Sequence, residues 1–362
     1  GEPDTSAYPP DLSDYAARLI ANRGYAANED LNYFMQEKPG PVSGEEIPYM
    51  TDAINRILAA MQAGKKIAVY GDYDVDGTTA VSIMLRTFMH LGYGNKVSFY
   101  VPQRHKEGYG FNQEAIEKLA QDNDLLISCD VGTNSNELIE HAQQQGLDVI
   151  VTDHHHISKA APKGALLVNP KALEDQKHPL YELSAAGLAL KVSELLLAAH
   201  GQGAYLANLM SLAAFSTIAD QVSVIGENRR IVQEGLSSKA INQAMQAIPG
   251  IRALIDEAGV HSNPVLQGYH PDDVAFRLGP IINAVGRLYH ASGIIKMFCS
   301  DDVEEVTQLA SEAVKNNQER KKLERKVVSQ GFDELAWSYK PGIDKVIVLA
   351  HQDWNKGVIG LA

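Results

Sequence analysis

The residues with the clearest capacity for chemistry are three alternating aspartates in the segment GDYDVDGTT, residues 71–79. Asp72, Asp74 and Asp76 follow an apolar run and precede a helical pattern, so their carboxylates should gather near the positive end of a helix dipole. Three adjacent carboxylates repel one another unless cations hold them. The segment therefore indicates a metal site, and the alternative is a solvated turn whose aspartates cap the helix. A calcium loop that starts at Asp72 is excluded, because its twelfth position is Ile83 and not a glutamate.

Two more segments place acidic or imidazole groups at the ends of buried runs. Asp130 follows the apolar run Leu125–Cys129. Alone it is better explained as a helix cap than as a functional residue. Asp153, His154 and His155 come shortly after the apolar run Asp148–Val151. Tandem histidines at a strand end are seldom core residues, because consecutive side chains cannot all face one apolar layer. An adjacent aspartate can orient an imidazole and fix its tautomer.

A fourth candidate is Asp220, which ends an apolar helical pattern. A carboxylate at the carboxyl end of a helix is unfavourable against the dipole, so a compensating charge is expected nearby. The alternative is a solvent-exposed helix terminus. Together with the first three segments, it completes a set of five carboxylates and one imidazole that suits Mn²⁺, or Mg²⁺, better than zinc. Two such ions about 3.5–4 Å apart suit in-line attack on phosphorus, so the chemistry predicted is phosphodiester hydrolysis.

The elements that must position these groups alternate regularly between helix and strand. Short runs rich in Val and Ile between helices predict an α/β fold with a parallel sheet covered on both faces, and ligands at the carboxyl ends of its strands. The expected helices are 51–63, 78–91, 112–121 and 134–145, with two more within 184–219. The expected strands are 66–70, 96–101, 125–129, 148–151 and 165–168.

The length of 362 residues exceeds what one hydrophobic core usually serves, so more than one domain is expected. We predict an N-terminal arm over 1–50, with an amphipathic stretch at 12–21, and a catalytic domain over 51–300. A long connecting helix is predicted over 301–340, because residues 301–330 contain neither Gly nor Pro. Residues 341–362 read as the start of a second, smaller α/β domain, with a strand at 345–349.

Composition narrows the function further. The chain is 45% hydrophobic and 21% charged, and no window approaches eighteen apolar residues, so we expect a cytoplasmic protein without a membrane span. Two cysteines cannot form a disulfide framework. A net charge of −13 argues against a broad basic surface for nucleic acid. That argument is incomplete, because carboxylates that hold metal ions count in the total although bound ions cancel their charge.

The motifs GDYDVDGTT, SCDVGTNS, DVIVTDHHH and TIADQV, in this order, resemble the four motifs of the DHH phosphoesterase superfamily, and DYDVDGT resembles its RecJ exonuclease branch. The resemblance runs from about Asp14 to the last residue and includes VPQRHKEGYGFN and INAVGRL. It implies a nuclease that uses Mn²⁺ or Mg²⁺ to degrade single-stranded DNA from its 5′ end to mononucleotides, in recombination and repair. The partners it implies are single-stranded DNA and, as candidates, single-strand-binding protein and other replication or repair proteins.

The resemblance also implies roles for individual residues. Asp130 would bridge two ions, Asp72 would be a ligand or lie close to one, His155 would face the scissile phosphate, and Asp153 would orient its neighbours. The ligands implied are Asp74, Asp76, Asp130, His154 and Asp220, and the residues implied to contact substrate phosphates are Arg104 and Arg287.

Two positions depart from the family pattern. Ile281 stands where the family usually has an arginine, and Asn355 where it has a histidine. The basic segment 315–326 fits a DNA-lining groove and a solvated helix face equally well. Two other functions stay open: a DHH phosphodiesterase of short oligonucleotides or cyclic dinucleotides, and a non-catalytic replication scaffold.

Overall fold

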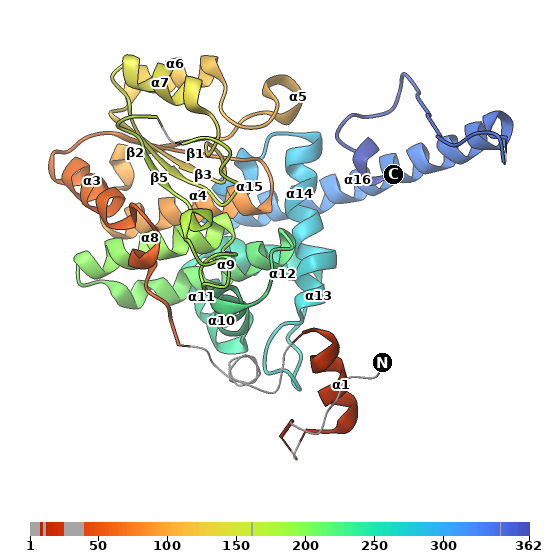
Figure 1. Cartoon of the computed structure of the whole chain (residues 1–362), viewed down its shortest axis with the longest axis horizontal. Coiled ribbons are helices and arrows are strands. Elements are labelled where there is room, and N and C mark those ends of the chain that lie inside the picture. Colours follow the sequence, from red (N-terminus) through yellow and green to blue (C-terminus); the bar gives the residue numbers. More distant parts are fainter. Residues whose placement is uncertain (1–7, 10–11, 25–39, 161, 341) are drawn as a thin grey trace.

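A computed structural model describes residues 8–9, 12–24, 40–160, 162–340 and 342–362. Its centre is a five-stranded parallel sheet with the strand order β2-β1-β3-β4-β5 (Figure 1). In the register, Ile67 of β1 lies between Val97 of β2 and Leu125 of β3. The strands are β1 (Ile67–Gly71), β2 (Val97–Tyr100), β3 (Leu125–Cys129), β4 (Asp148–Thr152) and β5 (Leu166–Val168).

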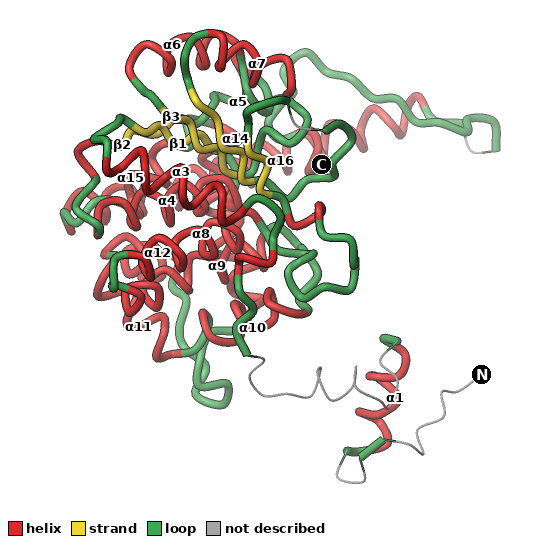
Figure 2. Tube along the Cα trace, turned by 60° about the vertical axis from the view of Figure 1, so that its left-hand side comes forward, coloured by secondary structure: helices red, strands yellow, loops and turns green. Residues whose placement is uncertain are grey.

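Helices cover both faces of this sheet, as the apolar runs predict. Side chains alternate along each strand, so Ile67 and Val69 of β1 join one apolar cluster while Ala68 and Tyr70 join another. The second cluster includes side chains of α6 (Gln113–Asp122) and α7 (Asn136–Gln144). The first includes side chains of α3 (Met50–Gln62), α4 (Val75–His90) and α8 (Ala185–Ala199). Figure 2 shows the two helical layers with the yellow strands between them.

Helix α4 begins at Val75, three residues before the predicted start. The reason is a side-chain cap: Oδ1 of Asp74 accepts a hydrogen bond from the backbone N–H of Gly77 at 3.1 Å. A capping carboxylate satisfies one of the free N–H groups of the first turn. As a result Asp76 lies inside the helix and not in the loop before it, and its side chain is 1% exposed.

The first apolar cluster continues into a helical region that packs beneath the sheet (Figure 1). Helix α9 is buried over most of its length, which its nearly uniform apolar sequence requires. The other helices of this region carry the more ordinary mixture of buried and exposed faces. They are α9 (Leu206–Ala219), α10 (Gly226–Gly235), α11 (Ser238–Ala247), α12 (Pro249–Ala258), α13 (Pro271–Asp273), α14 (Gly279–Leu288) and α15 (Ser292–Cys299), with a π-helix at Val274–Leu278.

Helix α16 (Val303–Ser338) is the long helix predicted from the absence of Gly and Pro, and it continues through Gly331. Figure 1 shows it leaving the body of the molecule, with the last residues returning along it. The strand predicted at 345–349 is wrong. Within the described residues no strand pairs with this segment, and Val346 and Val348 are 75% and 83% exposed. An isolated extended segment has no partner for its backbone hydrogen bonds.

The remaining helices are short. Helix α1 (Asp14–Asn22) forms where the amphipathic stretch was expected, and α5 (Arg104–Glu107) follows β2. In the ranges that the structure describes, no helix combines the length and apolar character needed to cross a membrane.

Candidate functional site

The ends of β1, β3 and β4 bring the predicted groups to one edge of the sheet. Asp72 follows β1, Asp130 follows β3 and His154 lies two residues after β4, because parallel strands end at a common edge. Asp130 has a φ of +68°, a left-handed conformation that Asp tolerates better than most residues. A fourth element of the site is helix α9, because Asp220, the residue that caps its C-terminal end, reaches the same place.

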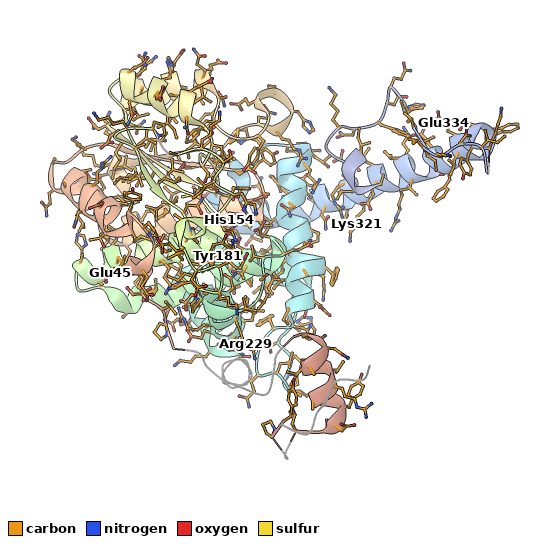
Figure 3. All side chains as sticks on the ribbon, in the orientation of Figure 1. Glu45, His154, Tyr181, Arg229, Lys321 and Glu334 are labelled. Carbon is orange, nitrogen blue, oxygen red and sulfur yellow. The ribbon has the colours of Figure 1, made fainter. Side chains whose placement is uncertain are left out.

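His154 is the centre of this cluster, and Figure 3 labels it between the sheet and the helices below. Its Nε2 atom lies 3.2 Å from Oδ1 of Asp130, 3.4 Å from Oδ2 of Asp76 and 3.7 Å from Oδ2 of Asp220. Candidate ligand atoms of Asp76, His154 and Asp220 all lie within 4.8 Å of one another. This spacing allows them to share one ion.

A second ligand set lies beside the first. Oxygens of Asp72, Asp74 and Asp130 also lie within 4.8 Å of one another. Asp130 thus contributes to this set and approaches His154 of the other. Oδ1 of Asp72 is buried and has no hydrogen-bond partner among the described residues. A buried carboxylate oxygen without a donor is costly unless a cation reaches it.

The electrostatics of the cluster point the same way. Burial, and then the charge of Asp74, raise the pKa of Asp72 to about 7. Burial and the carboxylates of Asp76 and Asp74 raise the pKa of Asp220 to about 8, and the same causes raise the pKa of Asp130 well above its ordinary value. Without a cation, these carboxylates therefore resist ionisation. A divalent ion supplies the missing positive charge, and an oxygen-rich set with one imidazole fits Mn²⁺ or Mg²⁺.

Asp76 is held differently from its neighbours. Its two carboxylate oxygens accept hydrogen bonds from the backbone N–H groups of Ala185 and Ala186, each at 2.7 Å, at the start of α8. Oδ1 also accepts the hydroxyl of Ser216 at 2.5 Å. Donors at a helix N-terminus stabilise an ionised carboxylate. These contacts fix Asp76 in position, and the role of Ser216 was not predicted.

His155 is oriented by the buried carboxylate of Asp153. Nδ1 of His155 lies 2.7 Å from Oδ1 of Asp153, and Oδ2 accepts the backbone N–H of Thr133 at 2.9 Å. Burial opposes ionisation of Asp153, but these hydrogen bonds outweigh it and lower the pKa to about 2. The hydrogen bond with Asp153 in turn raises the pKa of His155. The His155 side chain is 46% exposed, at the mouth of the cluster.

Arg104 and Arg287 line the same hollow as the carboxylates. Its volume is about 370 Å³, and its lining also includes Asp72, Asp74 and Asp220. Arg104 begins α5 and lies over the Tyr73 ring at 5.1 Å. Burial, followed by the charges of Arg104 and Arg320, lowers the pKa of Arg287 on α14. Guanidinium groups that repel one another beside a hollow form a site for an anion.

A second hollow of about 200 Å³ adjoins the first. It shares Gln221, Asn283 and Arg287 with the first and adds Arg320 of α16. Arg320 is held by Oδ1 of Asn317 at 3.0 Å and by Glu324 at 2.8 Å, and its side chain is 12% exposed. The basic segment 315–326 is thus divided: Arg320 faces the hollow, while Lys321 (labelled in Figure 3) and most other cations of the segment are exposed.

Two further residues of the site were not singled out from the sequence. Tyr109 lines the first hollow, and its hydroxyl lies 3.2 Å from Nε2 of His155. Asn283 lines both hollows, and its Oδ1 accepts the backbone N–H of Val75 at 3.1 Å. Both belong to segments quoted above for the family resemblance. Tyr109 and Asn283 could have been found from their neighbours, because each stands in the same segment as an arginine that was predicted to belong to the site.

The two departures from the family pattern lie outside the carboxylate cluster. Ile281 is 5% exposed and belongs to the hydrophobic core, so its side chain does not line the first hollow. Oδ1 of Asn355 accepts the backbone N–H of Gly357 at 2.8 Å. The carbonyl of Gly357 in turn accepts a hydrogen bond from Nη1 of Arg287 at 3.3 Å. Asn355 therefore organises a turn that contacts a site arginine.

Comparison with known proteins gives consistent results. Residues 66–217 match the DHH family, N-terminal domain. The chain is 33% identical to the single-stranded-DNA-specific exonuclease RecJ of Bacillus subtilis over 97% of its length and 42% of that protein. It is 29% identical to RecJ of Escherichia coli over 99% of its length and 62% of that protein. The chain thus spans about half the length of these curated relatives.

Solved structures show the same relationship. A crystal structure of exonuclease RecJ bound to manganese superposes with a TM-score of 0.77 at 30% identity, covering 89% of this chain and 77% of that one. RecJ of Thermus thermophilus in complex with Mn²⁺ superposes with a TM-score of 0.75 at 27% identity, covering 95% of this chain and 49% of that one. The parallel sheet with its surrounding helices, predicted from the sequence, is confirmed as the fold of these proteins.

Proposed function

Because this chain belongs to the RecJ family of DHH proteins, we propose that it is a metal-dependent exonuclease that acts on single-stranded DNA. The reaction would be hydrolysis of phosphodiester bonds from the 5′ end, with release of 5′-mononucleotides, in recombination and repair. One observation carries the proposal: five carboxylates and an imidazole converge on one edge of the sheet, beside a hollow lined by two arginines.

Two Mn²⁺ or Mg²⁺ ions are the proposed cofactors. Asp72, Asp74 and Asp130 would hold one ion, while Asp76, His154 and Asp220 would hold the other. Asp130 would bridge them, which agrees with its approach to both ligand sets. When bound, such ions neutralise charge on a phosphoryl group and lower the pKa of water so that it can attack at neutral pH. The unpartnered Oδ1 of Asp72 supports this assignment.

His155 and Asp153 would act on the reacting phosphate as a pair. Asp153 stays ionised because its pKa is about 2, and it holds the His155 ring by a hydrogen bond at 2.7 Å. A raised pKa keeps more of the His155 ring protonated near neutral pH, so the ring can donate a hydrogen bond or a proton to the departing oxygen. The Tyr109 hydroxyl, 3.2 Å from Nε2 of His155, lies where it can position the ring.

The arginines would bind the DNA backbone. Arg104 and Arg287 face the hollow beside the carboxylates and suit bidentate contact with a phosphate. The adjoining hollow extends this surface to Arg320. The position of Arg320 favours a role in a DNA-lining groove for this one residue of the basic segment 315–326. The continuation also favours an extended strand as substrate, because its successive phosphates can follow both hollows, over a compact cyclic dinucleotide. Every position at which a metal ligand is predicted carries an aspartate or a histidine, and this argues against a non-catalytic scaffold.

Single-stranded DNA is the proposed partner; single-strand-binding protein and other replication or repair proteins stay predictions from the family resemblance. The direct test is digestion of long single strands labelled at either end, with Mn²⁺, Mg²⁺ or chelator. We expect metal-dependent release of mononucleotides from the 5′ end. Activity confined to dinucleotides would favour the short-oligonucleotide phosphodiesterase, and binding without turnover would favour the scaffold.

A further inference from the structure

The two edges of the sheet differ in the contacts that they make with the rest of the molecule. At the β5 edge, α3 packs against the strand, and Arg56 of α3 donates to Oδ1 of Asp148 at 2.8 Å and to the carbonyl of Gly164 at 2.9 Å. At the other edge, β2 pairs with β1. Among the described residues, no backbone hydrogen bond joins β2 to a segment on its outer side. Figure 2 shows β2 at the outer end of the sheet.

The free edge of β2 is hollowed on both faces. One hollow of about 340 Å³ is lined mainly by apolar groups of α4 and α15, among them Leu85, Met89 and Cys299, and also includes Lys296, Ser300 and Glu305. The other, of about 350 Å³, lies over β2 and α6 and is called the polar hollow here, because charged and polar side chains such as Ser98 line it beside apolar ones such as Leu119. Both hollows include Val97 and Phe99 of β2. A strand added here would send alternate side chains into an apolar and a polar hollow.

The polar hollow carries the opposite charge to the chain as a whole. Lys66, Lys96 and Lys118 line it together with a single acidic residue, Asp122, whereas the chain has a net charge of −13. All three lysines are exposed. A second copy that paired through the same edge would bring these lysines face to face, because a two-fold contact juxtaposes identical surfaces. The charge therefore selects against self-pairing and for an acidic partner.

We propose that the β2 edge is a docking site for an extended segment of another protein in which acidic and apolar residues alternate. The segment would pair its backbone with β2. It would place apolar side chains against Leu85, Met89 and Phe99, and carboxylates against Lys66, Lys96 and Lys118. Backbone pairing supplies affinity in such strand addition, and the alternate pockets supply specificity. The proposal is independent of the nuclease function.

The test uses the full chain and two fluorescent nine-residue peptides, followed by anisotropy. One peptide alternates Glu or Asp with Val or Ile, and the other has Lys at each acidic position. We expect the acidic peptide to bind at least about tenfold more tightly than the basic one. The double variant Lys66→Glu with Lys118→Glu should weaken binding of the acidic peptide by at least about tenfold, while leaving DNA digestion unchanged. Lys239→Glu, an exposed charge reversal on α11, is the matched control and should leave peptide affinity unchanged.

A second measurement separates strand addition from loose charge attraction. Backbone amide exchange of residues 97–100 should slow when the acidic peptide is bound, because their outward groups become hydrogen-bonded. Met89→Lys, which puts a charge into the apolar hollow at an already exposed position, should also weaken binding. Equal affinity for both peptides, or unchanged exchange in β2, would overturn the proposal. So would a double variant that loses affinity for single-stranded DNA but keeps the peptide, because the lysines would then serve nucleic acid.

Discussion

At the scale of single residues, the site is built from carboxylates that are unfavourable without a cation. Asp72 has a buried oxygen with no donor among the described residues, and burial raises the pKa of Asp72 and Asp220 to about 7 and 8. Asp76 and Asp153 differ from this pair in their hydrogen bonds, because backbone N–H groups donate to both of them. The first pair therefore depends on an ion, whereas the second pair holds its geometry without one.

Asp130→Asn tests the bridging role with the least disturbance to the backbone. Asn tolerates the left-handed conformation of position 130, whereas Ala does not favour it. We expect Mn²⁺-dependent turnover to fall by about a hundredfold or more, because the bridging charge is lost. The melting temperature in chelator should not fall, since Asn removes a carboxyl group whose ionisation burial and the neighbouring carboxylates oppose. Turnover equal to that of the unchanged protein would refute the assignment.

The pKa of Asp220 predicts how metal-free stability depends on pH. The folded-state pKa is about 8 and the unfolded value about 3.9, so between these values the folded state holds a proton that the unfolded state releases. The contribution of Asp220 to stability is therefore present at low pH and is lost as pH rises from about 4 to 8.

Chemical denaturation of the unchanged protein and of Asp220→Asn in chelator measures this directly. The variant should gain stability relative to the unchanged protein as pH rises from 5 to 8, by up to about 1.4 kcal/mol per pH unit. Saturating Mn²⁺ at pH 8 should reverse the order, since only the carboxylate binds the ion well. A stability difference that stays constant with pH would contradict the raised pKa.

At the scale of elements, the carboxyl ends of the strands explain why distant residues meet. Helix α16 adds Arg320 to the hollow shared with Arg287, and it does so from outside the sheet altogether. One helix thus presents one half-buried cation to the site and several exposed cations to solvent.

Arg320→Ala should raise the KM for single-stranded DNA by about tenfold with little change in kcat, because a lost phosphate contact weakens binding more than chemistry. Arg325→Ala, an exposed arginine on the same helix, is the control and should change neither constant. A dinucleotide substrate too short to reach Arg320 should be unaffected by either substitution. If Arg320→Ala lowered kcat and left KM unchanged, the groove assignment would fail.

Most helices and strands of the sheet domain could be predicted from the sequence. The strand at 125–129 has the predicted bounds. A continuous apolar run of five residues between two helices is typical of a central strand of a parallel sheet, which is buried on both faces. The start of α4 was misplaced, since the cap at Asp74 competes with the metal interpretation of the same aspartate. The predicted strand at 345–349 failed because its apolar alternation finds no neighbouring strand among the described residues.

The residues of the candidate site could be predicted where a side chain able to bind metal directly follows a strand. Asp130 and His154 follow strands, so their meeting follows from topology. Tyr109 and Asn283 could not be found in this way, because a loop and a helix bring them in and neither has a distinctive spacing. The two hydrogen bonds from α8 to Asp76 were equally hidden, since they depend on helix packing.

At the scale of the whole molecule, an acidic chain carries a site for a polyanion. The net charge of −13 includes the clustered carboxylates, and ions bound there would reverse the local sign beside Arg104 and Arg287. The affinity for DNA should therefore depend on bound metal as well as on ionic strength. In chelator, the affinity for single-stranded DNA should fall at least about tenfold at fixed ionic strength. Equal affinity with and without Mn²⁺, measured by anisotropy, would show that the carboxylates do not face the substrate.

The central claim is that the two ligand sets hold two divalent ions that share Asp130. Anomalous diffraction at the manganese edge, from crystals of the full chain grown with Mn²⁺, measures this most directly. The account predicts two peaks about 3.5–4 Å apart, one beside Asp72 and Asp74 and the other beside Asp76, His154 and Asp220. A cluster without anomalous density at saturating Mn²⁺, or peaks located elsewhere in the molecule, would contradict it.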